Sequence, residues 1–157
     1  GDFTVNIALL KDFKPVMGII YAPVANELYY GAGSEAFMAL QDGPEQGIAV
    51  RNTPEAGLTV VVSKRHGDPS QIEEFLRGKK VAQVIARSSS LKFCSVAAGQ
   101  ADFYPRFGPT CEWDTAAGDA ILQAAGGRVT TLDGQPLSYG KTGRKFLNPA
   151  FLALSGR

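Results

Sequence analysis

Apolar and polar positions alternate along the first part of the chain in a way that predicts a series of short strands. From Phe3 to Leu9 every second residue is apolar, and a period of two is typical of a strand with one buried face. Glycine and Asp-Gly steps, which favour tight turns, separate three further apolar runs at 15–22, 27–33 and 35–43. We therefore predict an antiparallel meander over residues 3–41.

The segment 42–56 is rich in glycine, proline and polar residues, and we interpret it as a boundary. Beyond it the pattern of apolar and polar residues changes. Strand patterns at 58–64, 80–86, 101–107, 128–134 and 151–156 alternate with helical patterns at 68–78 and 89–100 and with a third helix that opens near Asp114. Such alternation predicts a mostly parallel sheet flanked by helices. The predicted class is α/β (α+β), with a meander over 1–52 and an α/β domain over 53–157.

The third helix follows the stretch Cys111-Glu112-Trp113-Asp114. Asp is among the commonest N-caps, so we predict that Asp114 caps this helix and that Gly126 ends it. Small residues at the spacing of one helical face, Ala117 to Ala124, would allow the helix to lie close to a sheet. A plain structural cap is thus one interpretation of Asp114.

Sheet geometry gives these residues a second interpretation. Helices that follow parallel strands direct their N-termini towards the ligand-binding edge of the sheet, where their amides attract anions. Ser88–Ser90, Lys92 and Arg106 would add donors and positive charge there. A carboxylate such as Asp114 fits among phosphate-binding groups if a divalent metal lies between them. Alternatives stay open: the serines as mere caps, Lys92 as a solvated residue, and Arg106 as a partner of Glu112.

Composition excludes several other classes. The chain has 157 residues, 45% of them hydrophobic and 20% charged, and a net charge of +1, which argues against a dedicated nucleic-acid-binding protein. No apolar run approaches the roughly 18 residues of a transmembrane helix, whereas peripheral membrane association stays open. Cys94 and Cys111 are expected to be free thiols in a reducing cytoplasm.

The stretch WDTAAGDAILQAAGG at 113–127 resembles a signature of the lithium-sensitive, magnesium-dependent phosphatase superfamily. That superfamily includes inositol monophosphatase, fructose-1,6-bisphosphatase and the 3'(2'),5'-bisphosphate nucleotidases. Further runs are similar to the bacterial nucleotidase branch, so that the resemblance extends from residue 1 to about residue 153: GDFTVNIAL, VSKRH, SSSLKFCSVAAGQADFYPRFGPT and FLNPAF.

The resemblance implies the layered sugar-phosphatase fold and Mg²⁺-dependent hydrolysis of a nucleotide bisphosphate, 3'-phosphoadenosine 5'-phosphate, to AMP and phosphate. It implies that Asp114 ligates the metal near the substrate phosphate and that His66 lies near the nucleotide. It also implies that Ser89, Lys92 and Arg106 contact the substrate. His66 is the single histidine, and without the resemblance a surface position would be the simpler interpretation of it.

One departure from the family pattern is equally informative. Family members carry an upstream glutamate and an Asp-Pro-Ile-Asp-Gly-Thr segment that supply most metal ligands and a water-activating threonine, whereas this sequence contains no Asp-Gly-Thr. We therefore expect a C-terminal portion of such an enzyme, with residues 1–52 as a remnant of the N-terminal domain. It would be inactive without its partner, the missing N-terminal portion. The alternatives are an inositol- or sugar-phosphate phosphatase of the same superfamily and a non-catalytic nucleotide-binding module.

Overall fold

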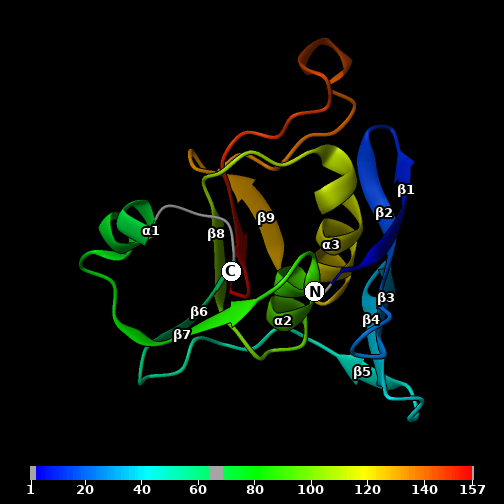
Figure 1. The fold of residues 1–157 in the computed structure, drawn as a ribbon, viewed down its shortest axis with the longest axis horizontal. Helices are drawn as coiled ribbons and strands as arrows, with labels where there is room; N and C mark the ends of the chain where they lie inside the picture. Colours follow the sequence, from blue (N-terminus) through cyan, green and yellow to red (C-terminus); the bar gives the residue numbers. More distant parts are fainter. Residues whose placement is uncertain (1–2, 64–68, 157) are drawn as a thin grey trace.

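The structure is a computed structural model that describes residues 3–63 and 69–156. Two five-stranded sheets enclose the helices α2 (Leu91–Ala97) and α3 (Glu112–Ala124), and α1 (Pro69–Leu76) covers the outer side of the second sheet (Figure 1). Phe75 of α1 stacks on Phe103 of that sheet with the ring centroids 5.7 Å apart. None of the helices in the described ranges has the length and apolar character that crossing a membrane would require.

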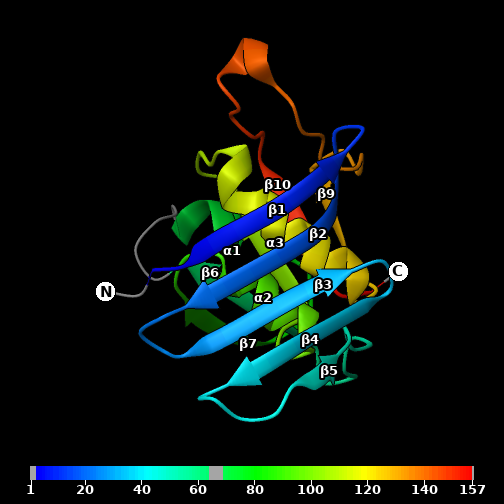
Figure 2. The ribbon, with the colours of Figure 1, turned by 90° about the vertical axis from the view of Figure 1, so that its right-hand side faces the viewer.

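The first sheet is the antiparallel meander that the alternation predicts (Figure 2). Its strands follow chain order: β1 (Val5–Lys11), β2 (Lys14–Ala22), β3 (Glu27–Ala32), β4 (Glu35–Leu40) and β5 (Gln46–Ile48). The strand β5 lies within the segment 42–56 and pairs with β4, so the predicted end of the meander at residue 41 is wrong. Three residues with a central glycine are too few to show an alternating pattern.

The second sheet is mixed. Its order is β7 (Val81–Arg87), β6 (Leu58–Ser63), β8 (Phe103–Arg106), β10 (Phe151–Leu154) and β9 (Arg128–Thr131). The strand β6 is parallel to β7 and β8, whereas β10 is antiparallel to β8 and β9. The predicted mixed class is confirmed, but the sheet is less parallel than expected. The chain enters β10 from a long connection whose one helical element is the short 3₁₀ turn η1 (Thr142–Arg144), and a parallel neighbour would need a full crossover.

Both sheets and both central helices contribute to one cluster of buried apolar residues. Its members come from both sheets and from α2 and α3, and they include Ile20, Val61, Phe93, Ile121 and Phe151. Residues on either side of the predicted boundary near residue 52 therefore share a core. The division into domains at 1–52 and 53–157 stays a prediction.

Helix α3 lies very close to its neighbours because small residues face each other. A Cβ atom added at Gly18 in β2 would come within 2.2 Å of the backbone oxygen of Ala117, and one added at Gly118 within 2.5 Å of the Phe93 ring. The predicted face of small residues is thus confirmed, since Ala117 and Ala124 are buried. Backbone atoms cannot move aside as a flexible side chain can, so the Gly18 position tolerates no larger residue.

We expect Gly18→Ala to lower the free energy of unfolding by about 2–3 kcal/mol, because the new methyl group forces α3 away from the sheet. Urea denaturation followed by circular dichroism measures the change. The matched control is Gly47→Ala in β5, where an added Cβ meets no atom within 4 Å. Equal effects of the two substitutions would contradict the role of the Gly18–Ala117 contact.

Candidate functional site

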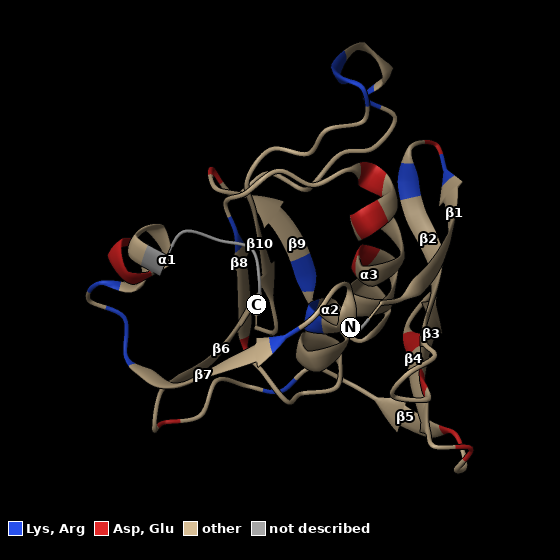
Figure 3. Cartoon of the chain, viewed as in Figure 1, with Lys and Arg blue, Asp and Glu red and all other residues tan. Residues whose placement is uncertain are grey.

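Helix α3 starts two residues before Asp114, so the prediction that Asp114 is the N-cap is wrong. Cys111 occupies the N-cap and Asp114 is the third residue of the first turn. The Oδ2 atom of Asp114 accepts a hydrogen bond of 2.9 Å from the backbone N–H of Cys111, as in a capping box. Acidic residues stabilise a helix at both positions, so the pattern alone could not separate them. Asp114 is exposed, at the positive end of the helix. Figure 3 shows acidic residues, in red, near the start of α3.

The serines before α2 lie beside the start of α3. The Ser90 hydroxyl donates a hydrogen bond of 3.2 Å to the backbone oxygen of Asp114 and accepts one of 2.9 Å from Nδ2 of Asn6. The Ser89 hydroxyl lies 2.7 Å from that of Thr4. Ser89 has a φ of +50°, which is uncommon for a residue other than glycine and a reason to examine its surroundings. These contacts join β1, α2 and α3 at one corner.

Lys92 is buried beneath this corner, with 3% of its surface exposed. Its Nζ atom donates a hydrogen bond of 2.5 Å to the backbone oxygen of Ser89 and lies 5.2 Å from the centre of the Tyr104 ring. Burial, and then the positive charge of Arg106, lower the pKa of Lys92 to about 8. The alternative of a solvated lysine is therefore wrong. The structure holds a cation that an anionic ligand would stabilise.

Arg106 lies at the end of β8 and is half-buried. Its Nε donates a hydrogen bond to the backbone oxygen of Gly108 (3.2 Å), and its Nη2 donates one to that of Pro109 (3.1 Å). The alternative of an ion pair with Glu112 is wrong, because the Glu112 carboxylate pairs with Nζ of Lys141 at 2.8 Å. The turn after β8 thus orients the guanidinium group.

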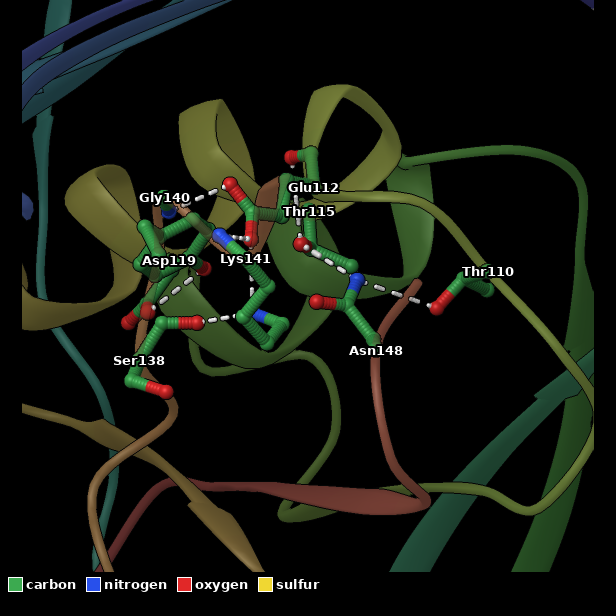
Figure 4. Close-up of polar contacts among 9 residues, drawn as sticks. Thr110, Glu112, Thr115, Asp119, Ser138, Gly140, Lys141 and Asn148 are labelled. Carbon is green, nitrogen blue, oxygen red and sulfur yellow. Dashed lines mark hydrogen bonds and ion pairs between the residues drawn. The ribbon is translucent and has the colours of Figure 1, made fainter. Parts of the chain in front are cut away.

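The segment 138–148 supports the start of α3 (Figure 4). Only its end, in the run FLNPAF, was part of the family resemblance, and no role was predicted for it. The Glu112 carboxylate accepts a hydrogen bond of 2.8 Å from the backbone N–H of Lys141. Nδ2 of Asn148 donates one of 3.0 Å to the Thr115 hydroxyl. Although burial raises the pKa of Glu112, the hydrogen bonds of Lys141 hold it below its ordinary value. An acidic residue directly before Trp113-Asp114 could have drawn attention to Glu112. Its partners Gly140 and Lys141, however, lie 28 and 29 positions further along the chain.

The structure brings most of the predicted site residues together. Lys92 is hydrogen-bonded to Ser89, and the charge of Arg106 contributes to the lowered pKa of Lys92. Ser90, next to Ser89, is hydrogen-bonded to the backbone oxygen of Asp114. Substrate contact by these residues stays a prediction. His66 lies outside the described residues, so its predicted position near the nucleotide stays a prediction too.

Asp114 offers one exposed carboxylate to a divalent cation. Within residues 3–63 and 69–156, no three or more His, Cys, Asp or Glu side chains form a group that could hold a metal ion. Mg²⁺ commonly combines one or two carboxylates with water and substrate phosphate oxygens. Asp114 therefore fits as one ligand of a magnesium site.

Comparisons with known proteins give a consistent result. Residues 1–152 match the sequence model of the inositol monophosphatase family. The 3'(2'),5'-bisphosphate nucleotidase CysQ of Escherichia coli (strain K12) is 47% identical over 96% of this chain, which covers 59% of that protein. The corresponding protein of Buchnera aphidicola is 42% identical over 98% of this chain and 57% of its own. The chain thus spans less than two thirds of these relatives.

Solved structures extend this comparison. The crystal structure of CysQ from Bacteroides thetaiotaomicron, a bacterial member of the same family, superimposes with a TM-score of 0.87 and 37% identity over 100% of this chain and 64% of that one. Inositol monophosphatase from Anabaena superimposes with a TM-score of 0.75 and 28% identity over 98% of this chain and 59% of that one.

We expect the Lys92 ammonium group to lose its proton near pH 8 instead of near 10.5. Between these values the unfolded chain holds this proton and the folded chain does not, so the free energy of unfolding rises with pH there. A ¹³C-lysine NMR titration measures the pKa, and Lys92→Met identifies the resonance by removing it. If every lysine resonance titrates above pH 10, the description of a destabilised cation is wrong.

Proposed function

Because this chain belongs to the inositol monophosphatase family, we propose that it forms part of a Mg²⁺-dependent phosphomonoesterase. Its substrate would be 3'-phosphoadenosine 5'-phosphate, which it would hydrolyse to AMP and phosphate. The family resemblance inferred from the sequence is confirmed by the match over residues 1–152. The choice of substrate is supported by the 47% identity to a protein named 3'(2'),5'-bisphosphate nucleotidase.

The observation that carries the proposal is that the exposed carboxylate of Asp114 lies near polar and cationic groups that would suit a phosphate. Ser89 and Lys92 at the start of α2 lie beside Asp114 at the start of α3. Lys92 and Arg106 would neutralise phosphate charge, and the amide dipoles of the 13-residue α3 would add to their effect. Oδ2 of Asp114 accepts a hydrogen bond from the Cys111 amide, and we propose that Oδ1 binds the metal.

When bound, Mg²⁺ supplies Lewis acidity and lowers the pKa of a coordinated water. Asp114 would contribute one ligand. We propose that the other carboxylates and the group that activates water come from the missing N-terminal portion, within the length of the relatives that this chain does not span. The chain alone would then be inactive, and the two portions together would form the enzyme. We also propose a cytoplasmic location, in line with the free thiols of Cys94 and Cys111.

Two other functions each have one supporting observation. Similarity to the Anabaena inositol monophosphatase favours a sugar-phosphate substrate, and parallel assays with inositol monophosphate and 3'-phosphoadenosine 5'-phosphate distinguish the two. The buried Lys92 ammonium group beside the Ser89 turn, which would bind a phosphate without a metal, favours a non-catalytic nucleotide-binding module. Calorimetry with AMP in EDTA tests this function, because a module would bind AMP without metal.

We expect Asp114→Asn to lower phosphate release on the order of a thousandfold or more, about 4 kcal/mol of transition-state stabilisation. The assay uses 3'-phosphoadenosine 5'-phosphate and millimolar Mg²⁺, with the chain supplemented by the portion of the E. coli relative that it does not span. Asparagine can still accept the Cys111 hydrogen bond, so the helix start should persist.

The control for this experiment is Asp42→Asn, which changes an exposed acid in a turn of the first sheet and should leave the rate unchanged. Two results would refute the proposal: full turnover by the unsupplemented chain, or an Asp114→Asn rate within tenfold of the parent.

A further inference from the structure

Segment 138–148 is held against the start of α3 largely by polar contacts. The carboxylate of Glu112 accepts hydrogen bonds from the backbone N–H groups of Gly140 (2.7 Å) and Lys141 (2.8 Å). Residues 142–147 are all exposed. Segments with few buried apolar contacts and with solvent-exposed hydrogen bonds open locally at a lower free energy than the core. We therefore expect this segment to open while the two sheets stay folded.

The buried part of this attachment is the contact between Asp119 of α3 and Tyr139 of the segment, which are 1 and 5% exposed. The Tyr139 hydroxyl donates a hydrogen bond of 2.8 Å to Oδ2 of Asp119, and Nε2 of Gln123 donates one of 2.8 Å to Oδ1. Figure 4 shows Asp119 beside the start of the segment. Both hydrogen-bonding partners are uncharged, and none of the ion pairs found within the described ranges includes Asp119. The fold thus buries an acid without a cation, which disfavours its charged form.

The surroundings of Asp119 suit a neutral carboxylic acid as well as a carboxylate. In the neutral form the acid O–H can donate to the Tyr139 oxygen. The Tyr139 O–H can then turn to the Thr115 hydroxyl, which also interacts with it. The proton of Thr115 is engaged with the backbone oxygen of Glu112 at 3.2 Å, so the Thr115 oxygen can accept. Each of these protons therefore has an acceptor when Asp119 is protonated.

Opening of the segment is linked to the proton on Asp119. Burial, the largest cause, raises the pKa of Asp119 to about 6, whereas the hydrogen bonds of Gln123 and Tyr139 lower it. When the segment opens, water reaches the carboxylate and its pKa returns towards the ordinary 3.8. The closed form thus holds a proton that the open form releases. The closed form is favoured at low pH, and that advantage is lost as the pH rises through 6.

We propose that Asp119 and Tyr139 form a pH-sensitive switch that keeps segment 138–148 closed on the start of α3 at acid pH and lets it open near neutral pH. In the closed state at acid pH, Asp119 is protonated and hydrogen-bonded to Tyr139. In the open state both side chains are in contact with water and Asp119 is a carboxylate. The proton that leaves Asp119 on opening goes to the solvent.

The switch acts on the candidate site, and in this respect the inference rests on the proposed function. The backbone N–H of Glu112 donates a hydrogen bond of 2.9 Å to the backbone oxygen of Phe146. On the other side of Asp114, the Thr115 hydroxyl accepts one of 3.0 Å from Asn148. The segment therefore fixes the helical turn that carries the Asp114 carboxylate. Opening the segment would release this turn and make the position of the carboxylate dependent on pH.

Charged residues of the elements packed against α3 are not among the causes of the raised pKa of Asp119. They are Lys11, Lys14, Glu27, Glu35, Lys92 and Arg128. On α3 itself Glu112 pairs with Lys141 of the segment. The tyrosines of β2 and β3 and the Cys94 thiol are neutral in the acid range. His66 lies outside the described residues, and since histidine ordinarily titrates near pH 6.5, its contribution is separated by experiment.

Amide hydrogen exchange of this chain at a series of pH values from 4 to 8, read by NMR and corrected for the intrinsic rates, tests the inference. An Asp119 pKa near 4 in the open form and near 6 in the closed form predicts that protection of the Gly140 and Lys141 amides falls about tenfold between pH 5 and pH 7. These amides should also exchange faster than those of β6 in the core, as local opening requires. Exchange as slow as that of β6 would mean that the whole fold opens, and it would overturn the inference.

Two variants change the switch in different ways. Asp119→Asn should make the protection of these amides independent of pH, because its side chain has no proton to release in this range. Tyr139→Phe should move the midpoint of the change to higher pH, since it removes a hydrogen bond that lowers the pKa of Asp119. Unfolding midpoints show whether each variant is folded, and Tyr139→Phe keeps the test decisive if Asp119→Asn is not.

The matched controls are Asp133→Asn, which changes an exposed acid in the turn after β9, and His66→Gln. Both should show the same pH dependence of protection as the parent. The inference is overturned by protection that does not change between pH 5 and pH 7 in the parent, by an unaltered change in Asp119→Asn, or by loss of the change in His66→Gln.

Phosphate release is measured separately over the same pH range, on the chain supplemented with the portion of the E. coli relative that it does not span. Protection that depends on pH through Asp119, without hydrolysis, supports the switch and refutes the proposed function. Hydrolysis with protection that is independent of pH supports the function and overturns the switch.

Discussion

The direct contact between α3 and the first sheet determines where every group of the candidate site lies. No side chain separates Gly18 of β2 from the backbone of Ala117, so the helix has a single distance from the sheet. The start of α3 then comes level with β1, where Ser90 connects Asn6 to the backbone of Asp114. Close packing of backbone on backbone is stiff, and it gives the exposed Asp114 carboxylate a defined direction.

Charge is distributed unevenly around this rigid contact. Lys92 is buried with the Ser89 carbonyl as its hydrogen-bonding partner. Burial, and then the positive charge of Arg106, lower the pKa of Lys92. A phosphate group bound there would remove that unfavourable interaction, so the folded chain is preorganised for an anion. Glu112 has the opposite role, because its carboxylate is neutralised by Lys141 and by backbone amides and is not available to a ligand.

Much of the fold could be predicted because hydrophobic alternation is a local property. The meander and the strand–helix succession follow from it, whereas β5 is too short to show it. The direction of β10 depends on a long connection and not on its own residues. The start of α3 was misplaced because Asp suits both the N-cap and the third position. Lys92 is covered by Tyr104 and by the turn at Ser89. The spacing of residues in the sequence does not show that these groups lie beside it.

The part of the site that sequence could predict is the set of residues implied by the family resemblance. The structure brings four of them to one corner, and His66 is outside the described residues. The supporting role of segment 138–148 could not be predicted, because its hydrogen bonds join residues far apart in the sequence. Lys141 and Glu112, for example, are 29 positions apart. Within the described residues, Asp114 belongs to no group of three or more His, Cys, Asp or Glu side chains that could hold a metal ion.

The central claim, that the start of α3 and the serine–lysine corner form one metal- and phosphate-binding site, is tested most directly by paramagnetic NMR. Mn²⁺ added with AMP should broaden the amide resonances of residues 111–115 and 89–90 before any others, and Asp114→Asn should abolish the effect. Broadening that begins elsewhere in the chain, or that is unchanged in Asp114→Asn, would contradict the account.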